Sequence, residues 1–111
     1  PHMLAYALTM ALAKDPLQSM QHGGGALRDM TRIAGSDPVM WRDIALTNCV
    51  ALLRAVTSVE AELSHLKALI AAGDGEGLTA YFAHCRNVRR DHDLLLNPLF
   101  EPAESPHEIP Q

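Results

Sequence analysis

Two arginines, Arg28 and Arg32, lie four residues apart in a run that starts with three consecutive glycines. On a helix this spacing puts both side chains on one face, where like charges repel unless an anion lies between them. Glycines before a helix let the backbone approach a bound group, and the free N–H groups of a helix start favour an anion. The run therefore predicts a carboxylate or phosphate site. The alternative, more common from spacing alone, is an exposed ion pair of Asp29 with Arg32, worth well under about 1 kcal/mol.

The single tryptophan, Trp41, follows Arg32 by nine residues across a predicted turn. Its ring either closes a pocket over a ring-shaped ligand or anchors the core, and the core role is the more frequent one. The six histidines are scattered, without an HExxH motif or paired Cys/His spacing, so we expect no metal site. Ser36 is better explained as a helix cap than as a nucleophile, because no base stands at a suitable position.

The composition favours packed helices. Of the 111 residues 48% are apolar but only five are aromatic, so the core must consist mostly of Leu, Ala, Val, Ile and Met. A net charge of −4 argues against nucleic acid or an anionic membrane surface as the main partner. There is no CxxC spacing, no bilayer-spanning apolar run and no signal-peptide pattern at the start. We expect a cytoplasmic protein with reduced thiols.

Apolar spacings of three and four residues divide the chain into helices. Gly35 suits a left-handed C-cap, Ser36-Asp37-Pro38 starts a helix with a capping side chain and a first-turn proline, and Asp74 caps the last helix. Asn48 is a capping type within a helical stretch, which predicts a kink or a restart. The expected helices cover residues 2–14, 26–34, 38–47, 49 to about 72, and 76–96.

The longest expected helix carries a regular row of apolar residues, here called the apolar seam. Such a row packs against another long helix, either within the chain or between two copies. Four prolines spaced four residues apart break any helix after residue 96 and predict a tail over residues 97–111. We therefore expect one all-α domain over residues 1–96, a bundle with one long central helix. The seam consists of Cys49, Leu52, Val56, Val59, Leu63, Leu66 and Ile70.

Residues 24–34, Gly-Gly-Ala-Leu-Arg-Asp-Met-Thr-Arg-Ile-Ala, and residues 36–44, Ser-Asp-Pro-Val-Met-Trp-Arg-Asp-Ile, resemble the C-terminal helical domain of prephenate and arogenate dehydrogenases. The resemblance continues at lower specificity to about residue 95. It implies an intertwined homodimer whose helical domain closes one side of the substrate cleft. The family's N-terminal Rossmann domain, which binds the nucleotide and holds the catalytic histidine, is expected to be absent from this chain.

The resemblance implies an enzyme of tyrosine biosynthesis that oxidatively decarboxylates prephenate to 4-hydroxyphenylpyruvate. Hydride passes to NAD or NADP, which the missing domain binds, and no metal takes part. Arogenate is the alternative substrate, and tyrosine is a possible feedback inhibitor. By itself the chain is expected to be inactive, because it offers no general acid or base and no cofactor site.

The resemblance also assigns roles to particular residues. Arg32 looks like the arginine that grips a substrate carboxylate with its planar fork, an interaction worth about 1.5 to 3 kcal/mol. Trp41 resembles the family tryptophan near the cleft, and Gly25 the glycine whose backbone faces the ligand. Arg28 and Asp29 resemble an ion pair that gates or braces the site. These roles predict a substrate-binding surface without a catalytic residue.

Family members carry a Pro-His pair where the first helix begins, and that histidine contacts substrate or tyrosine. Pro1-His2 is therefore interpreted as native sequence and His2 as a substrate-binding residue, although Pro1-His2-Met3 also matches the remnant of a cleaved tag. Ala26 and Leu27 depart from the glycine and phenylalanine that the family often has. Two other functions stay open: a stand-alone helical oligomerisation or protein-binding module, and the helical domain of a different Rossmann-type dehydrogenase.

Overall fold

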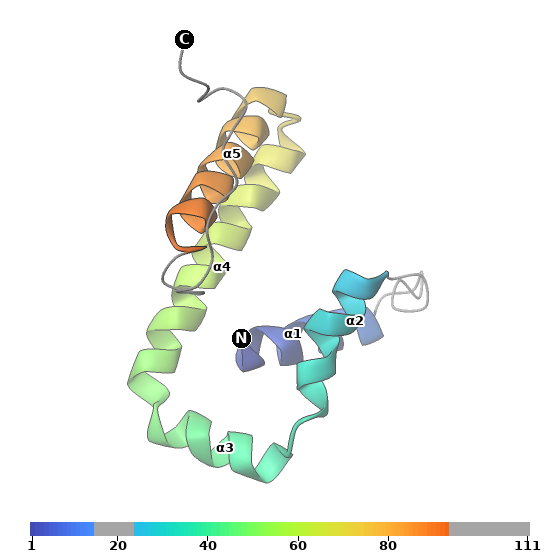
Figure 1. Ribbon diagram of the computed structural model, residues 1–111, viewed down its shortest axis with the longest axis vertical. Coiled ribbons are helices and arrows are strands. Elements are labelled where there is room, and N and C mark those ends of the chain that lie inside the picture. The colour runs from blue at the N-terminus through green and yellow to red at the C-terminus, as the bar shows by residue number, and fades with distance from the viewer. Residues whose placement is uncertain (15–23, 94–111) are drawn as a thin grey trace. The chain divides into compact units, whose positions relative to one another are not determined.

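The computed structural model describes residues 1–14 and 24–93, and all regular structure in these residues is helical (Figure 1). This confirms the predicted all-α class. The expected tail at 97–111 and the end of the last predicted helix lie outside the described residues. The chain divides into two units, residues 1–63 and 64–111, and each is treated by itself. The elements are α1 (His2–Ala13), α2 (Gly25–Arg32), the 3-10 turn η2 (Ile33–Gly35), α3 (Pro38–Thr47), α4 (Cys49–Ala71) and α5 (Gly75–Asp91).

Helix α3 starts and ends as its capping residues predict. The Asp37 carboxylate accepts a hydrogen bond of 3.1 Å from the Val39 N–H. Asp37 lies directly before Pro38, which occupies the first turn of the helix. At the other end, the Asn48 side-chain amide donates to the Ile44 carbonyl at 2.9 Å, and α4 continues from α3 at an angle of 96°. The predicted restart at Asn48 is confirmed. No single helix of the described residues is long and apolar enough to cross a membrane; α3 and α4 meet that test only jointly, across this bend.

Gly35 does not adopt the predicted left-handed conformation. Among the described glycines only Gly73, which follows α4, has a positive φ, of 63°. Residues 33–35 tighten into η2 instead, and the Ser36 hydroxyl and backbone N–H both donate to the Ile33 carbonyl, at 2.7 and 3.1 Å. These two bonds satisfy the Ile33 carbonyl, so no left-handed residue is needed to supply a hydrogen-bond donor at the end of this turn. Ser36 therefore caps the preceding turn, and Asp37 caps α3.

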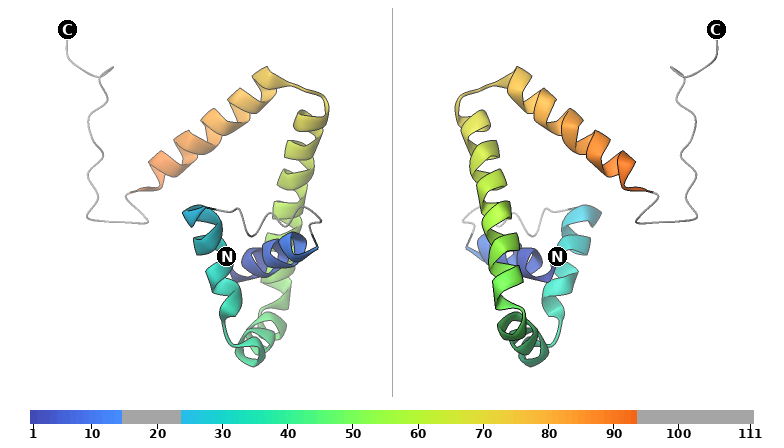
Figure 2. Two further views of the ribbon diagram at one scale, coloured as in Figure 1. Left: turned by 90° about the vertical axis from the view of Figure 1, so that its right-hand side faces the viewer. Right: turned by 90° about the vertical axis from the view of Figure 1, so that its left-hand side faces the viewer.

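The first unit has a small core of its own. Helix α1 packs against α2 and η2 (Figure 2), and Ala5, 4% exposed, is the only fully buried residue in the described part of the chain. Large apolar side chains on α3 and α4 stay open to solvent, with Leu46 69%, Val50 65% and Leu53 66% exposed. The helices of this unit thus leave much of their apolar surface uncovered.

In the second unit, the start of α5 lies close to the end of α4. The Asp74 carboxylate accepts from the Gly77 N–H at 2.9 Å, as its predicted capping role requires. The rings of His65 and Tyr81 lie 5.5 Å apart, so Tyr81 faces α4. A Cβ built on Gly77 would lie 2.9 Å from Leu69 Cδ2 and would also collide with Asp74, so this position accepts only glycine without rearrangement.

This packing distinguishes two neighbouring glycines of α5. We expect Gly77→Ala to lower the free energy of unfolding by about 1 kcal/mol or more, although alanine favours a helix, because the new methyl group has no room. Gly75→Ala is the matched control, since a Cβ there meets nothing within 4 Å. Urea unfolding followed by circular dichroism measures both. Equal stability of the two variants would contradict the close approach at Gly77.

Candidate functional site

Two residues that the sequence singled out separately, His2 and Trp41, stack on each other. Their ring centroids lie 3.5 Å apart and their planes differ by 16°. Both side chains are half-buried, and neither ring makes a hydrogen bond to another described residue. Their nitrogen atoms thus stay available to a ligand. Trp41 is therefore half-buried with one ring face against His2, and its role in ligand binding stays a prediction.

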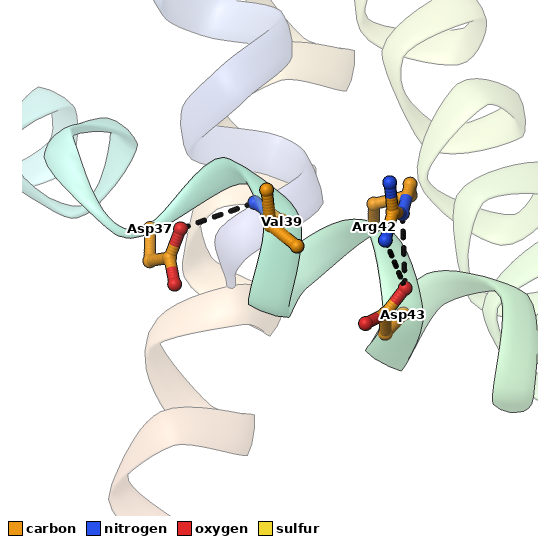
Figure 3. Close-up of polar contacts among 4 residues, drawn as sticks. All are labelled: Asp37, Val39, Arg42 and Asp43. Atoms are coloured by element: carbon orange, nitrogen blue, oxygen red, sulfur yellow. Dashed lines mark hydrogen bonds and ion pairs between the residues drawn. The ribbon is translucent and has the colours of Figure 1, made fainter.

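Local backbone structure fixes both rings. His2 is the first residue of α1, where the Pro1 carbonyl accepts the first helical hydrogen bond, 2.9 Å from the Ala5 N–H. Trp41 lies one turn into α3, where its N–H donates to the Asp37 carbonyl at 3.2 Å. The hydrogen bond from the Val39 N–H to the Asp37 carboxylate closes this turn (Figure 3). The proline after Asp37 also favours the helix start. Each ring therefore stands close to a well-defined helix start.

His2 and Trp41 line a groove of about 340 Å³ between α1 and α4, here called the α1–α4 groove. Its other walls are mostly apolar side chains of these two helices, and the apolar seam supplies one of them. Among the described residues, Glu60 is the one acidic residue that lines it, and no Lys or Arg does so. From α1 come Met3, Leu4 and Ala7, and from α4 come Leu52, Ala55, Val56, Val59 and Leu63.

The remaining predicted site residues belong to α2. Gly25 begins this helix and Arg32 ends it, and the side chains of Arg28, Asp29 and Arg32 are exposed. Within residues 1–14 and 24–93 none of these three forms an ion pair, and none lines the α1–α4 groove. A Cβ on Gly25 would meet nothing within 4 Å, so its backbone is open to an approaching group. The gating, bracing and carboxylate-binding roles of these residues stay predictions.

Arg42, the residue after Trp41 in sequence, forms an ion pair with its own neighbour. Arg42 and Asp43 form an exposed ion pair, with Nη2 and Oδ1 2.9 Å apart (Figure 3). Both side chains are 61% exposed, so the pair contributes well under about 1 kcal/mol to stability. Arg42 is therefore an exposed residue whose charge is paired with that of its neighbour. The described residues also contain no cluster of His, Cys, Asp or Glu that could hold a metal ion.

Sequence reasoning missed Glu60 as a site residue. It follows Val59 of the apolar seam and lies one helical turn after Val56, so its spacing already placed it beside the seam. The sequence alone did not show which helix faces the apolar seam. In the structure the middle of the seam faces α1 across the groove, and Glu60, although exposed, is one of the residues that line it.

Residues 1–84 match the family described as prephenate dehydrogenase, dimerization domain. The match covers most of the 111 residues and includes His2, Arg32 and Trp41. The chain therefore belongs to this family, which confirms the predicted membership.

Similar proteins support the same assignment. Cyclohexadienyl dehydrogenase of Zymomonas mobilis subsp. mobilis is 35% identical over 102 residues, which cover 85% of this chain and 35% of that protein. Prephenate dehydrogenase of Bacillus subtilis is 37% identical over 65 residues, or 59% of this chain and 18% of that protein. Prephenate dehydrogenase of Lactococcus lactis subsp. cremoris is 27% identical over 97 residues, or 85% and 27%. The chain thus spans between 18% and 35% of the length of these curated relatives.

The ring stack makes Trp41 a reporter of the site. We expect His2→Ala to shift the fluorescence emission of this chain to longer wavelength and to increase quenching by acrylamide, because the indole loses the ring that covers one of its faces. Trp41 is the only tryptophan, so the signal has one source. His84→Ala, on α5, should leave emission unchanged. An unaltered spectrum in His2→Ala would show that the rings do not stack in solution.

Proposed function

We propose that this chain is the dimerization and substrate-cleft domain of a prephenate dehydrogenase, which oxidatively decarboxylates prephenate to 4-hydroxyphenylpyruvate in tyrosine biosynthesis. The observation that carries the proposal is the contact between His2 and Trp41. The family resemblance connects both residues with the ligand, and they share one groove in a chain of the dimerization-domain family. Flat ring faces beside an apolar wall suit a six-membered carbon ring.

In this proposal the residues of the chain bind and orient the substrate. Arg32 grips a substrate carboxylate with its fork, and the open backbone at Gly25 faces the ligand. Arg28 and Asp29 gate or brace the approach. These groups position the substrate for a reaction whose proton-transfer group lies in another part of the enzyme.

The hydride acceptor is NAD or NADP in the proposed reaction. The described residues do not fit a dinucleotide site, because they form no strand and no glycine-rich turn from a strand into a helix. We therefore propose that the cofactor binds to another domain, and we assign no step through it to this chain. Cys49 and Cys85 are free thiols, which supports the proposed cytoplasmic location.

We further propose that the enzyme is a homodimer held together by this domain. Leu46, Val50 and Leu53 are each more than 60% exposed on α3 and α4, and an apolar surface of this kind is typical of an interface. The matched family is named for dimerization. A second copy would cover the apolar surface that the small core of the first unit leaves open.

The carboxylate role of Arg32 is testable in the enzyme at its natural length. Arg32→Ala should raise KM for prephenate at least about tenfold with little change in kcat, because a charge-assisted pair of about 1.5 to 3 kcal/mol is lost. Arg32→Lys should restore little, since an ammonium group cannot make the planar two-bond contact. Arg54→Ala, on α4 and outside the groove, is the control. Unchanged kinetics of Arg32→Ala would reject the assignment.

The proposed dimer interface has its own test. Leu53→Asp should shift the protein from dimer to monomer in sedimentation equilibrium, because a buried carboxylate without a partner opposes association. Ser58→Asp adds the same charge to an exposed polar position of α4 and should leave the dimer intact. A dimer of unchanged affinity in Leu53→Asp would place the interface elsewhere.

A further inference from the structure

The α4 wall of the α1–α4 groove is more exposed than the wall of an enclosed ligand pocket. Val56 is 39%, Val59 38% and Leu63 56% exposed, although all three line the groove. Sites for small molecules bury most of the ligand surface, whereas an open groove with apolar walls suits the apolar face of a helix. This wall therefore offers a docking surface to a helix.

Glu60 gives this surface a negative charge. It lies four residues after Val56 and three before Leu63, so an apolar side chain of the wall lies about one turn away on either side. Within residues 1–14 and 24–93 the Glu60 carboxylate forms no ion pair or hydrogen bond, and no Lys or Arg lines the groove. A helix that docks here is therefore expected to carry an apolar side chain and, one turn away, a cation.

Helix α5 carries this pattern. Phe82 is 57% exposed, and Arg86, one turn later on the same side of the helix, is also exposed. Arg86 forms no ion pair with the described part of the chain, whereas the next arginine, Arg89, pairs with Asp93. Aromatic and arginine side chains are the most frequent anchors of protein interfaces.

The interface proposed above reaches the rim of the groove. Leu53, which is 66% exposed, lies seven residues before Glu60, or about two turns, so both residues are on the same side of α4. A second copy that covers Leu53 is therefore adjacent to Glu60. The matched family is named for dimerization, which favours a second copy over an unrelated protein as the source of the docked helix.

We propose that α5 of a second copy docks in the α1–α4 groove, with its Phe82 on the apolar wall and its Arg86 against Glu60. The proposal rests on the proposed homodimer and deepens it, because it names the helix and the ion pair that join the copies. In a symmetric dimer each copy gives one groove and one α5, so the contact forms twice. Docking closes the open side of the groove, so the site that contains His2 and Trp41 is complete only in the dimer.

Charge reversal in two separate chains tests the contact between copies. Glu60→Arg alone and Arg86→Glu alone should each raise the dimer dissociation constant at least about tenfold in sedimentation equilibrium, because each brings two like charges together twice. An equimolar mixture of the two variants should dimerize at least about tenfold more tightly than either alone. In the mixed dimer one contact pairs the two native residues and the other pairs the two substituted ones. The experiment uses the enzyme at its natural length.

Arg90→Glu is the matched control, because Arg90 is an exposed arginine of α5 that lies more than one turn from Phe82. A mixture of Arg90→Glu with Glu60→Arg should show no preferential pairing. Unchanged dimer affinity in Glu60→Arg or in Arg86→Glu would overturn the proposal. So would a mixture no tighter than its components when one chain with both substitutions is restored, because the contact would then lie within a chain.

The fluorescence of Trp41, which lines the groove, gives a second readout. Dilution of this chain from dimer to monomer should move the emission to longer wavelength, because the groove loses its cover. Phe82→Ala should produce the same shift in the dimer, whereas Val88→Ala should not, since Val88 lies six residues later on a different face of α5. Emission that does not change with dilution or in Phe82→Ala would show that no second copy covers the groove.

These outcomes are separable from the proposed function. Oxidation of prephenate by the unsubstituted enzyme supports that function whichever helix occupies the groove. A dimer that Leu53→Asp dissociates, but that neither charge reversal weakens, would keep the proposed homodimer and reject the docking of α5. Absence of activity with prephenate and with arogenate rejects the function even if the mixed dimer forms.

Discussion

The site depends on the stacking of the His2 ring on the Trp41 ring. This contact joins the first residue of α1 to the first turn of α3, two elements that are well separated in sequence. The same two rings also line the groove whose long walls come from α1 and α4. A flat contact with a centroid separation of 3.5 Å restricts the relative tilt of these helix starts far more than contacts between flexible aliphatic side chains do.

In the proposed dimer, the groove and the interface would be coupled, because the core of the first unit is small. With only Ala5 fully buried among the described residues, the apolar faces of α3 and α4 gain little from packing within the chain. A second copy that covers them would stabilise the folded domain by mass action. The groove shares α4 with this uncovered surface, so a dimer formed through that surface would also hold one wall of the groove.

Local signals predicted most of the helices, whereas the site needed contacts that no local signal contains. Asp37, Asp74 and Asn48 act where their residue types predict, because capping depends on a few neighbouring atoms. The prediction of a left-handed cap at Gly35 was wrong, because η2 satisfies the carbonyl at this helix end without a left-handed residue. The His2–Trp41 contact depends on how distant helix starts meet, which apolar periodicity does not encode, and the groove position of Glu60 depends on which helix faces the seam.

The bend at Asn48 sets the direction of α3 relative to α4, and with it the position of Trp41. Trp41 lies seven residues before this corner, about 10 Å along the helix at about 1.5 Å per residue. A change of about 10° in the angle between α3 and α4 therefore displaces the indole by about 2 Å over such a length. The corner is set by an amide side chain bonded to the Ile44 carbonyl and not by a rigid proline ring. Substitutions at Asn48, which does not line the groove, would therefore change the width of the groove through the angle between α3 and α4.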